Sequence, residues 1–240
     1  MRAWAVAALD LVFPARCPVC DSTLGDGRRD PLCGGCWDTF ERVAPPVCDT
    51  CGLPFPVFVG SPVARGGRCG ECASTPPVFD WARAGGLYAG PLREAVQRFK
   101  FGGKPALARP LGALVLEQWA ARLPSADAVL PVPLARARER ERGFNQAGLL
   151  AERVARGLGC RVQTRWLARA RDTRPQTDLD VAERRANVRG AFVASSAVAG
   201  RSLVLVDDVL TTGATAAECA RVLRAAGART VGVLTVARVL

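Results

Sequence analysis

Four Cys-x-x-Cys pairs fall within 56 residues near the start of the chain, and they constrain the fold more than any other feature. The pairs read CPVC, CGGC, CDTC and CGEC, with 12 residues between the first two and 17 between the last two. One such turn presents two thiolates to a tetrahedral ion, and a second turn completes a closed zinc site. The array therefore predicts two structural Zn2+ sites, formed by Cys17, Cys20, Cys33, Cys36, Cys48, Cys51, Cys69 and Cys72.

The spacing of the array argues against other interpretations. A redox-active Cys-x-x-Cys motif occurs singly at a strand–helix junction, not four times in one segment. Four pairs can be matched in three ways. Sequential matching needs the shortest loops, and a cross-braced arrangement stays open. Residues 14–76 are rich in Pro and Gly, so we expect this module not to fold without metal. Cys160 and Cys219 lie outside the array and are interpreted as core thiols.

The composition limits the chemistry that the chain can perform. There is no histidine, which excludes Ser-His-Asp and Cys-His catalysis and imidazole acid–base chemistry. The net charge is +11, which favours an acidic, phosphorylated or nucleic-acid partner. Lysine occurs only at positions 100 and 104, and compositional drift explains why arginine replaces it elsewhere. Compositional drift explains less well why basic residues outnumber acidic ones.

The N-terminus and the remaining chain show no membrane-spanning pattern. No window reaches the roughly 18 apolar residues that a transmembrane helix needs, so we expect no membrane insertion. Residues 1–13 are interrupted by Asp10 and predict a short helix, not a signal peptide. The sequence therefore predicts a cytoplasmic protein.

From residue 79 to residue 240 the pattern changes to short apolar strands alternating with helices. Strands are expected at 81–88, 128–133, 202–207 and 230–237, with helices at 91–101, 107–123, 146–158 and 215–226. Residues 136–146 are expected to form an Arg-rich loop, and residues 166–190 a charged loop with a short helix. This alternation indicates βαβ units and a mostly parallel sheet flanked by helices.

The segment LVLVDDVLTTGAT, residues 203–215, places two carboxylates before a turn of small, hydroxyl-bearing residues. A metal site, a phosphate cradle and an ordinary capped strand–turn–helix compete as interpretations. The cradle is favoured because amides and hydroxyls of a small-residue turn, followed by a helix N-terminus, bind a phosphate. The carboxylates suit the cis-hydroxyls of a ribose. No GxxxxGK[ST] loop occurs, so a P-loop ATPase is not expected. The segment therefore predicts a ribose-phosphate ligand.

These motifs together resemble a known family. VDDVLTTGAT, residues 206–215, resembles the phosphoribosyl pyrophosphate (PRPP) loop of type I phosphoribosyltransferases. DLVFPARCPVC, FKFGGK at 99–104, PVPL at 131–134, RGFNQA at 142–147, RPQ at 174–176 and RRANVRGAF at 184–192 resemble the ComF family, which is associated with DNA uptake in natural competence. The resemblance covers essentially the whole chain. It implies a phosphoribosyltransferase-like α/β domain preceded by a double zinc ribbon.

The resemblance also implies roles for individual residues. Asp207 and Asp208 would bind the PRPP ribose, and Thr211, Thr212, Gly213 and Thr215 its 5-phosphate, with Val209, Leu210 and Ala214 in the same loop. Mg2+ would bridge the ribose hydroxyls and the pyrophosphate. Arginine forks suit pyrophosphate oxygens. The candidates for the pyrophosphate site are Val132, Pro133, Arg136, Arg142, Arg169, Arg171 and Gln176.

Two functions follow from these features and stay open at the level of sequence. The first is a ComF-like competence protein that handles single-stranded DNA, built on a PRPP-binding fold and acting with competence machinery proteins. The alternative is an active phosphoribosyltransferase that uses PRPP and a base or nucleotide acceptor. A PRPP sensor is a third possibility.

Overall fold

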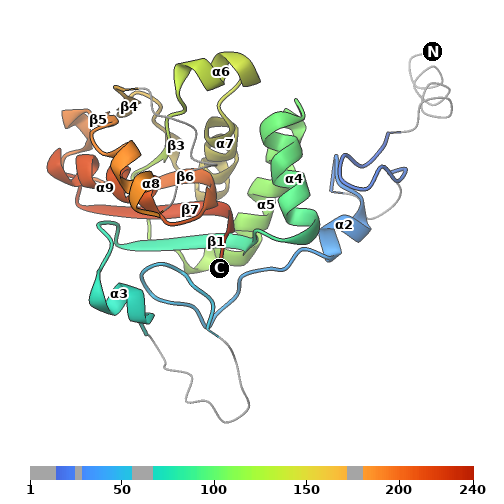
Figure 1. Ribbon diagram of the computed structural model, residues 1–240, viewed down its shortest axis with the longest axis horizontal. Coiled ribbons are helices and arrows are strands. Elements are labelled where there is room, and N and C mark those ends of the chain that lie inside the picture. The colour runs from blue at the N-terminus through green and yellow to red at the C-terminus, as the bar shows by residue number, and fades with distance from the viewer. Residues whose placement is uncertain (1–14, 25–28, 56–66, 172–180) are drawn as a thin grey trace, which may run out of the picture.

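A computed structural model describes residues 15–24, 29–55, 67–171 and 181–240. Its centre is a five-stranded, all-parallel sheet in the order β1-β7-β6-β2-β3 (Figure 1). These strands are β1 Trp81–Leu87, β2 Ala128–Pro131, β3 Arg161–Val162, β6 Ser202–Leu210 and β7 Thr230–Arg238. A separate antiparallel pair joins β4 Leu167–Arg169 to β5 Phe192–Ala194. This arrangement confirms the predicted α/β fold class.

Helices cover both faces of the sheet. Successive residues of its central strands point to opposite faces and are apolar on each face, so both faces need a cover of helices. Val204, Val206 and Leu234 pack with residues of three helices, and Leu203 and Val233 pack on the opposite face with α9. The first face carries α4 Gly90–Phe101, α5 Ala108–Trp119 and α7 Gln146–Leu158. The second face carries α9 Ala214–Ala225, with α8 Val181–Val188 beside it. Strands buried on both faces are typical of parallel sheets.

The structure differs from the sequence-based expectation in three places. Residues 136–142 were expected to be a loop but form the helix α6 Arg136–Arg142, because Arg, Ala and Glu are good helix formers and Gly143 ends the helix with a φ of 79°. Strand β6 continues through Leu210, so Asp207 and Asp208 lie within the strand and not beyond its end. The strands β3, β4 and β5 were not expected, because strands of two or three residues are too short to show an alternating pattern in the sequence. The expected helix over residues 1–13 lies outside the described residues.

The cysteine-rich segment contributes two short helices, α2 Gly34–Asp38 and α3 Gly70–Ser74, and lies along the outer strand β1 (Figure 1). Backbone hydrogen bonds join the two parts: Val43 N–H to Gly85 O at 3.1 Å, Leu87 N–H to Glu41 O at 2.7 Å, and Ala82 N–H to Thr50 O at 2.6 Å. Apolar residues of the segment, Trp37 and Phe40 among them, belong to the same core cluster as α4 and α5. The cysteine-rich segment and the sheet therefore share one core.

No helix in the described ranges is both long enough and apolar enough to cross a membrane.

The cysteine-rich segment approaches β1 closely at Gly52, and a substitution there tests whether this close approach is required. Its φ is 70°, and a Cβ added there would lie 2.4 Å from Ala82 O. Gly200 has a similar φ of 71° with nothing within 4 Å, so it is a matched control. We expect Gly200→Ala to cost about 1–2 kcal/mol of unfolding free energy through its backbone conformation alone. Gly52→Ala is expected to cost more, because the added methyl group collides with the strand. Equal losses in urea denaturation would contradict this.

Candidate functional site

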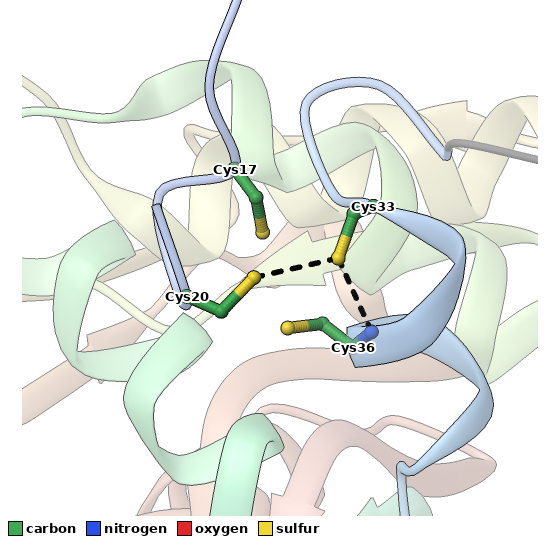
Figure 2. A group of neighbouring side chains, drawn as sticks. All are labelled: Cys17, Cys20, Cys33 and Cys36. Carbon is green, nitrogen blue, oxygen red and sulfur yellow. Dashed lines mark hydrogen bonds between the residues drawn. The ribbon is translucent and has the colours of Figure 1, made fainter. Parts of the chain in front are cut away.

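The first cysteine cluster joins the turn after residue 16 to the start of α2. The sulfur atoms of Cys17, Cys20, Cys33 and Cys36 all lie within 4.8 Å of one another and converge on a common centre (Figure 2). The Cys20 and Cys33 sulfurs are 3.6 Å apart, and the Cys36 N–H points at the Cys33 sulfur at 3.3 Å. A hydrogen bond with the Ser22 hydroxyl lowers the pKa of Cys20 to about 6, which favours the thiolate.

The second cluster has the same architecture and lies against β1 and β7. The sulfur atoms of Cys48, Cys51, Cys69 and Cys72 also lie within 4.8 Å of one another. Burial raises the pKa of Cys48, but N–H groups of Cys69 and Cys51 aimed at its sulfur outweigh that effect and lower the pKa to about 6. The Arg238 guanidinium, at the end of β7, donates to Cys51 O at 2.6 Å. This bond links the cluster directly to the sheet.

Both clusters fit tetrahedral zinc. With Zn–S bonds of about 2.3 Å, the edge of a ZnS4 tetrahedron is about 3.8 Å. The S–S distances of 3.6 Å between Cys20 and Cys33 and 3.7 Å between Cys51 and Cys69 are close to that value and far above the roughly 2.0 Å of a disulfide. The pairing is the sequential one, 17/20 with 33/36 and 48/51 with 69/72. The prediction of two four-cysteine zinc sites is thereby confirmed, and the cross-braced alternative is wrong.

We expect two zinc ions per chain, held independently. Cys20→Ser and Cys48→Ser should each reduce the bound zinc to about one ion per chain, because each removes one of four ligands from one site. Inductively coupled plasma mass spectrometry of the purified proteins measures this. Cys219→Ser is the control, since this thiol lies on the buried face of α9 and belongs to neither cluster. Loss of both ions in one single variant would contradict independent sites.

A second candidate site is a cavity of about 560 Å³ at the carboxyl ends of β2 and β6. Ligands of open parallel sheets bind at this edge. Most residues of the predicted ligand site line it: Val132, Pro133, Arg142, Arg169, and the whole run from Asp207 through Thr215. The fold therefore brings together segments that lie far apart in the sequence.

The turn after β6 has the geometry of an anion cradle. Gly213 adopts a φ of 73°, which glycine tolerates best, and it is the N-cap residue that directly precedes α9. The Thr212 hydroxyl accepts a hydrogen bond from Ala214 N–H at 3.4 Å. The N-terminus of the 12-residue helix α9 follows at once, so its first N–H groups border the cavity. Such a turn favours a phosphate group.

The two aspartates of β6 are held in different electrostatic surroundings. Lys100 Nζ, from the end of α4, lies 2.8 Å from Asp208 Oδ1. Asp207 accepts a hydrogen bond from Asp208 N–H at 2.8 Å. Burial raises the pKa of Asp207 to about 7, and the adjacent Asp208 carboxylate adds to this shift, while Lys100 and Arg169 oppose it. One carboxylate is thus paired, and the other titrates near neutral pH.

Cationic and amide side chains also line the cavity. Arg169 Nη1 donates to Pro133 O at 3.3 Å and its guanidinium lies over the Phe192 ring, so β4 carries this side chain to the cavity. Arg142 Nη1 donates to the side-chain oxygen of Gln146 at 3.0 Å. Asn145 caps α7 through Ala147 N–H and also donates to Val132 O. Asn145 thereby links the start of α7 to the loop after β2.

Three candidates from the sequence are placed elsewhere. Arg136 is exposed on the first turn of α6 and is not among the residues that line the cavity. Arg171 donates to Asn187 O and Arg189 O, where it ties the end of α8 to the segment after β4. Gln176 lies outside the described residues.

Lys100 was not among the predicted site residues, although the sequence contained a signal for it. In a chain where nearly every basic residue is arginine, lysine stands only at 100 and 104. The structure shows Lys100 in contact with a site carboxylate, whereas Lys104 is exposed. Tyr88, Gln97, Phe101 and Glu141 also line the cavity and were not predicted.

The raised pKa of Asp207 predicts a pH-dependent stability. An unfolded aspartate loses its proton near pH 4, while folded Asp207 keeps it to about pH 7. The free energy of unfolding should therefore fall as pH rises between those values. Asp207→Asn removes this effect, so we expect the variant to exceed the wild type by more than about 1 kcal/mol at pH 8, since each pKa unit corresponds to about 1.4 kcal/mol.

Urea denaturation of both proteins between pH 4 and pH 8 measures this difference. The comparison is made between the two proteins because acid protonates the zinc thiolates of both alike. A stability gap that stays constant across this range would contradict the assignment.

Comparison with known proteins identifies the two parts of the chain. Residues 8–73 match the double zinc ribbon domain, and residues 145–240 match the phosphoribosyl transferase domain. The chain is therefore a phosphoribosyltransferase-like α/β protein with an N-terminal double zinc ribbon.

Relatives are similar over nearly the whole chain. The sequence is 35% identical over 235 residues to the DNA utilization protein YhgH of Escherichia coli O6:H1, covering 96% of this chain and 100% of that protein. It is 31% identical over 234 residues to competence protein F of Haemophilus influenzae, covering 94% and 98%. Competence protein ComFC of Bacillus subtilis is 27% identical over 201 residues, covering 81% and 78%. The chain belongs to the ComF family, and the resemblance seen in the sequence is confirmed.

Proposed function

We propose that this protein is a cytoplasmic competence protein that binds PRPP in the cavity at the carboxyl ends of β2 and β6 and handles single-stranded DNA during DNA uptake. One observation carries the PRPP part of the proposal: Asp207, Asp208 and the 211–215 cradle line a single cavity. The names of the relatives, competence protein F and DNA utilization protein, support the competence part.

The chemistry of the cavity supports a ribose ligand with phosphates at both ends. The carboxylates of Asp207 and Asp208 would accept hydrogen bonds from the ribose hydroxyls, and the turn from Thr211 to Thr215 would hold the 5-phosphate. Arg142 and Arg169 line the same cavity and would face the pyrophosphate. Mg2+, when bound with PRPP, would neutralise part of the polyphosphate charge.

The charge of the protein supports a single-stranded DNA partner. The net charge is +11, and α6 presents exposed Arg136 and Arg140 beside Arg138 and Arg142 at the cavity. Basic side chains along one helix suit the phosphates of a nucleic-acid strand. Binding through phosphates would weaken steeply with salt.

An active phosphoribosyltransferase is the second candidate, favoured by the match of residues 145–240 to that domain. Such an enzyme would displace pyrophosphate at the anomeric carbon of PRPP by an acceptor nucleophile, through an oxocarbenium-like transition state. Arginines and amides would stabilise the departing pyrophosphate, which requires no histidine. Release of pyrophosphate from PRPP with an acceptor, and its loss in the Asp207/Asp208 double variant, would distinguish an enzyme from a binding protein.

The central test is calorimetric titration with PRPP and Mg2+. We expect the Asp207→Asn/Asp208→Asn double variant to bind PRPP at least about 10-fold more weakly, because hydrogen bonds to charged groups contribute about 1.5–3 kcal/mol each. Asp38→Asn is the matched control, since it makes the same change on the exposed surface of α2. Wild-type affinity in the double variant would contradict the assignment of the carboxylates.

The same proteins are then titrated with a fluorescein-labelled single-stranded oligonucleotide. The expected affinity falls with salt, with a logarithmic slope of about −0.7 for each phosphate contact. If the two sites are coupled, PRPP changes the oligonucleotide affinity by the same factor as the oligonucleotide changes PRPP affinity. Failure to bind the oligonucleotide even at low salt would overturn the DNA-handling part of the proposal.

A further inference from the structure

Phe101 is an exposed aromatic side chain at the entrance of the cavity. It is the last residue of α4, it is 68% exposed, and it lines the cavity that contains the aspartates. The other exposed large apolar residues of the described chain are aliphatic: Val78, Val193, Val239 and Leu240. None of these four lines the cavity. A single exposed apolar residue is ordinary, so the surroundings of Phe101 decide whether it has a role.

The ring of Phe101 is held in place from two directions. The guanidinium carbon of Arg142 lies 4.7 Å from the ring centroid, and Arg142 is itself anchored by Gln146. The preceding residue, Lys100, is tied to Asp208 by the 2.8 Å ion pair, so the end of α4 is fixed next to the carboxylates. Because Phe101 remains 68% exposed with Arg142 against it, the ring keeps an uncovered surface.

A polar group lies on the same face of α4. Gln97 precedes Phe101 by four residues, so the two side chains are neighbours on the helix, and both line the cavity. The Gln97 amide makes no hydrogen bond with any other residue in the part of the chain that the structure describes. An amide of this kind offers both donors and an acceptor to the edge of a planar ligand.

We propose that Phe101 is the stacking platform for a nucleobase, with the Gln97 amide beside it to contact the edge of the base. The inference rests on the proposed function, because it adds a base position to the cavity assigned to the ribose and phosphates. The ligand chemistry is a planar heteroaromatic ring attached to a ribose phosphate. Its source is either a free nucleotide or a nucleotide unit of a single strand.

The charges around Phe101 favour a nucleobase over an apolar ligand. Arg138 and Arg142 line the same entrance, and they suit phosphates attached to the stacked base. A protein partner that docks through apolar contacts needs a contiguous apolar patch, whereas Phe101 stands among charged and amide side chains. Stacking tolerates every base, because each has a π-face.

The test compares base-containing and abasic ligands on the wild type and four variants. Phe101→Ala removes the ring, Phe101→Leu keeps apolar volume without a π-face, and Phe101→Tyr keeps the ring. Val193→Ala is the control, since it truncates an exposed apolar side chain on β5 outside the cavity. The ligands are AMP, an oligonucleotide of about 12 nucleotides, and an abasic oligonucleotide of the same length, at low salt. Thermal unfolding checks that each variant is folded.

We expect Phe101→Ala and Phe101→Leu to weaken the binding of base-containing ligands about 10-fold, within the range measured for single stacking contacts. Phe101→Tyr and Val193→Ala should bind as the wild type does, and the abasic strand should be unaffected by every change. An effect on AMP alone identifies a free nucleotide as the source. An effect on the oligonucleotide alone identifies the strand.

Three outcomes would overturn the inference. These are equal affinity of Phe101→Ala and wild type for base-containing ligands, an equal loss with the abasic strand, and no base-dependent binding by the wild type. The wild type is also titrated with PRPP in parallel. This measurement distinguishes failure of the base position from failure of the proposed PRPP-binding function. A protein that binds PRPP but shows no dependence on Phe101 keeps its proposed function and loses only the base position.

Discussion

The burial of strand β6 on both faces is the constraint from which the site follows. The strand is paired on both sides with parallel neighbours and covered by helices above and below, so its apolar residues alternate between two cores. Acidic side chains are tolerated there only at the carboxyl end, where the sheet opens into the cavity. Asp207 and Asp208 occupy that end, and the turn that leads into α9 follows within a few residues. Burial of the strand thus places the carboxylates and the anion cradle next to each other.

Keeping two adjacent carboxylates at the end of a buried strand requires compensation from elsewhere in the chain. Lys100 supplies it at Asp208 through a direct ion pair, whereas Asp207 is compensated by charges at longer range and keeps its proton up to near neutral pH. Arg169 reaches the same region from β4, and its guanidinium is positioned by Pro133 O and the Phe192 ring. A ligand that brings hydroxyl donors to the carboxylates and phosphates to the arginines would satisfy both sets of groups at once.

Local patterns in the sequence predicted most of the fold, because zinc turns and βαβ units are local features. The four Cys-x-x-Cys pairs, the four long strands and the helices α4, α5, α7 and α9 each carry their signal within about 20 residues. The predicted carboxylates and cradle also line one cavity, because Asp207 through Thr215 form one continuous stretch of chain. Contacts between distant segments left no such signal. The Lys100–Asp208 pair, the placement of Phe101 and the loss of Arg171 to backbone carbonyls depend on how α4, β6 and α8 meet in space. Helix α6 was not predicted because its run of charged residues was interpreted as a solvated loop. The high helix propensity of Arg, Ala and Glu was not taken into account.

The position of the zinc-bearing segment along β1 has a consequence beyond the support of its own turns. β1 is an outer strand of the sheet. The Leu87 and Ala82 N–H groups of β1 donate to the segment, and Gly85 O of β1 accepts from Val43 N–H, so the segment satisfies these backbone groups on the open side of the strand. An uncovered strand edge is a template for pairing with another chain. We therefore expect zinc to affect solubility as well as stability, because a molecule that loses its metal, and with it the fold of the segment, would expose the edge of β1 to intermolecular strand pairing.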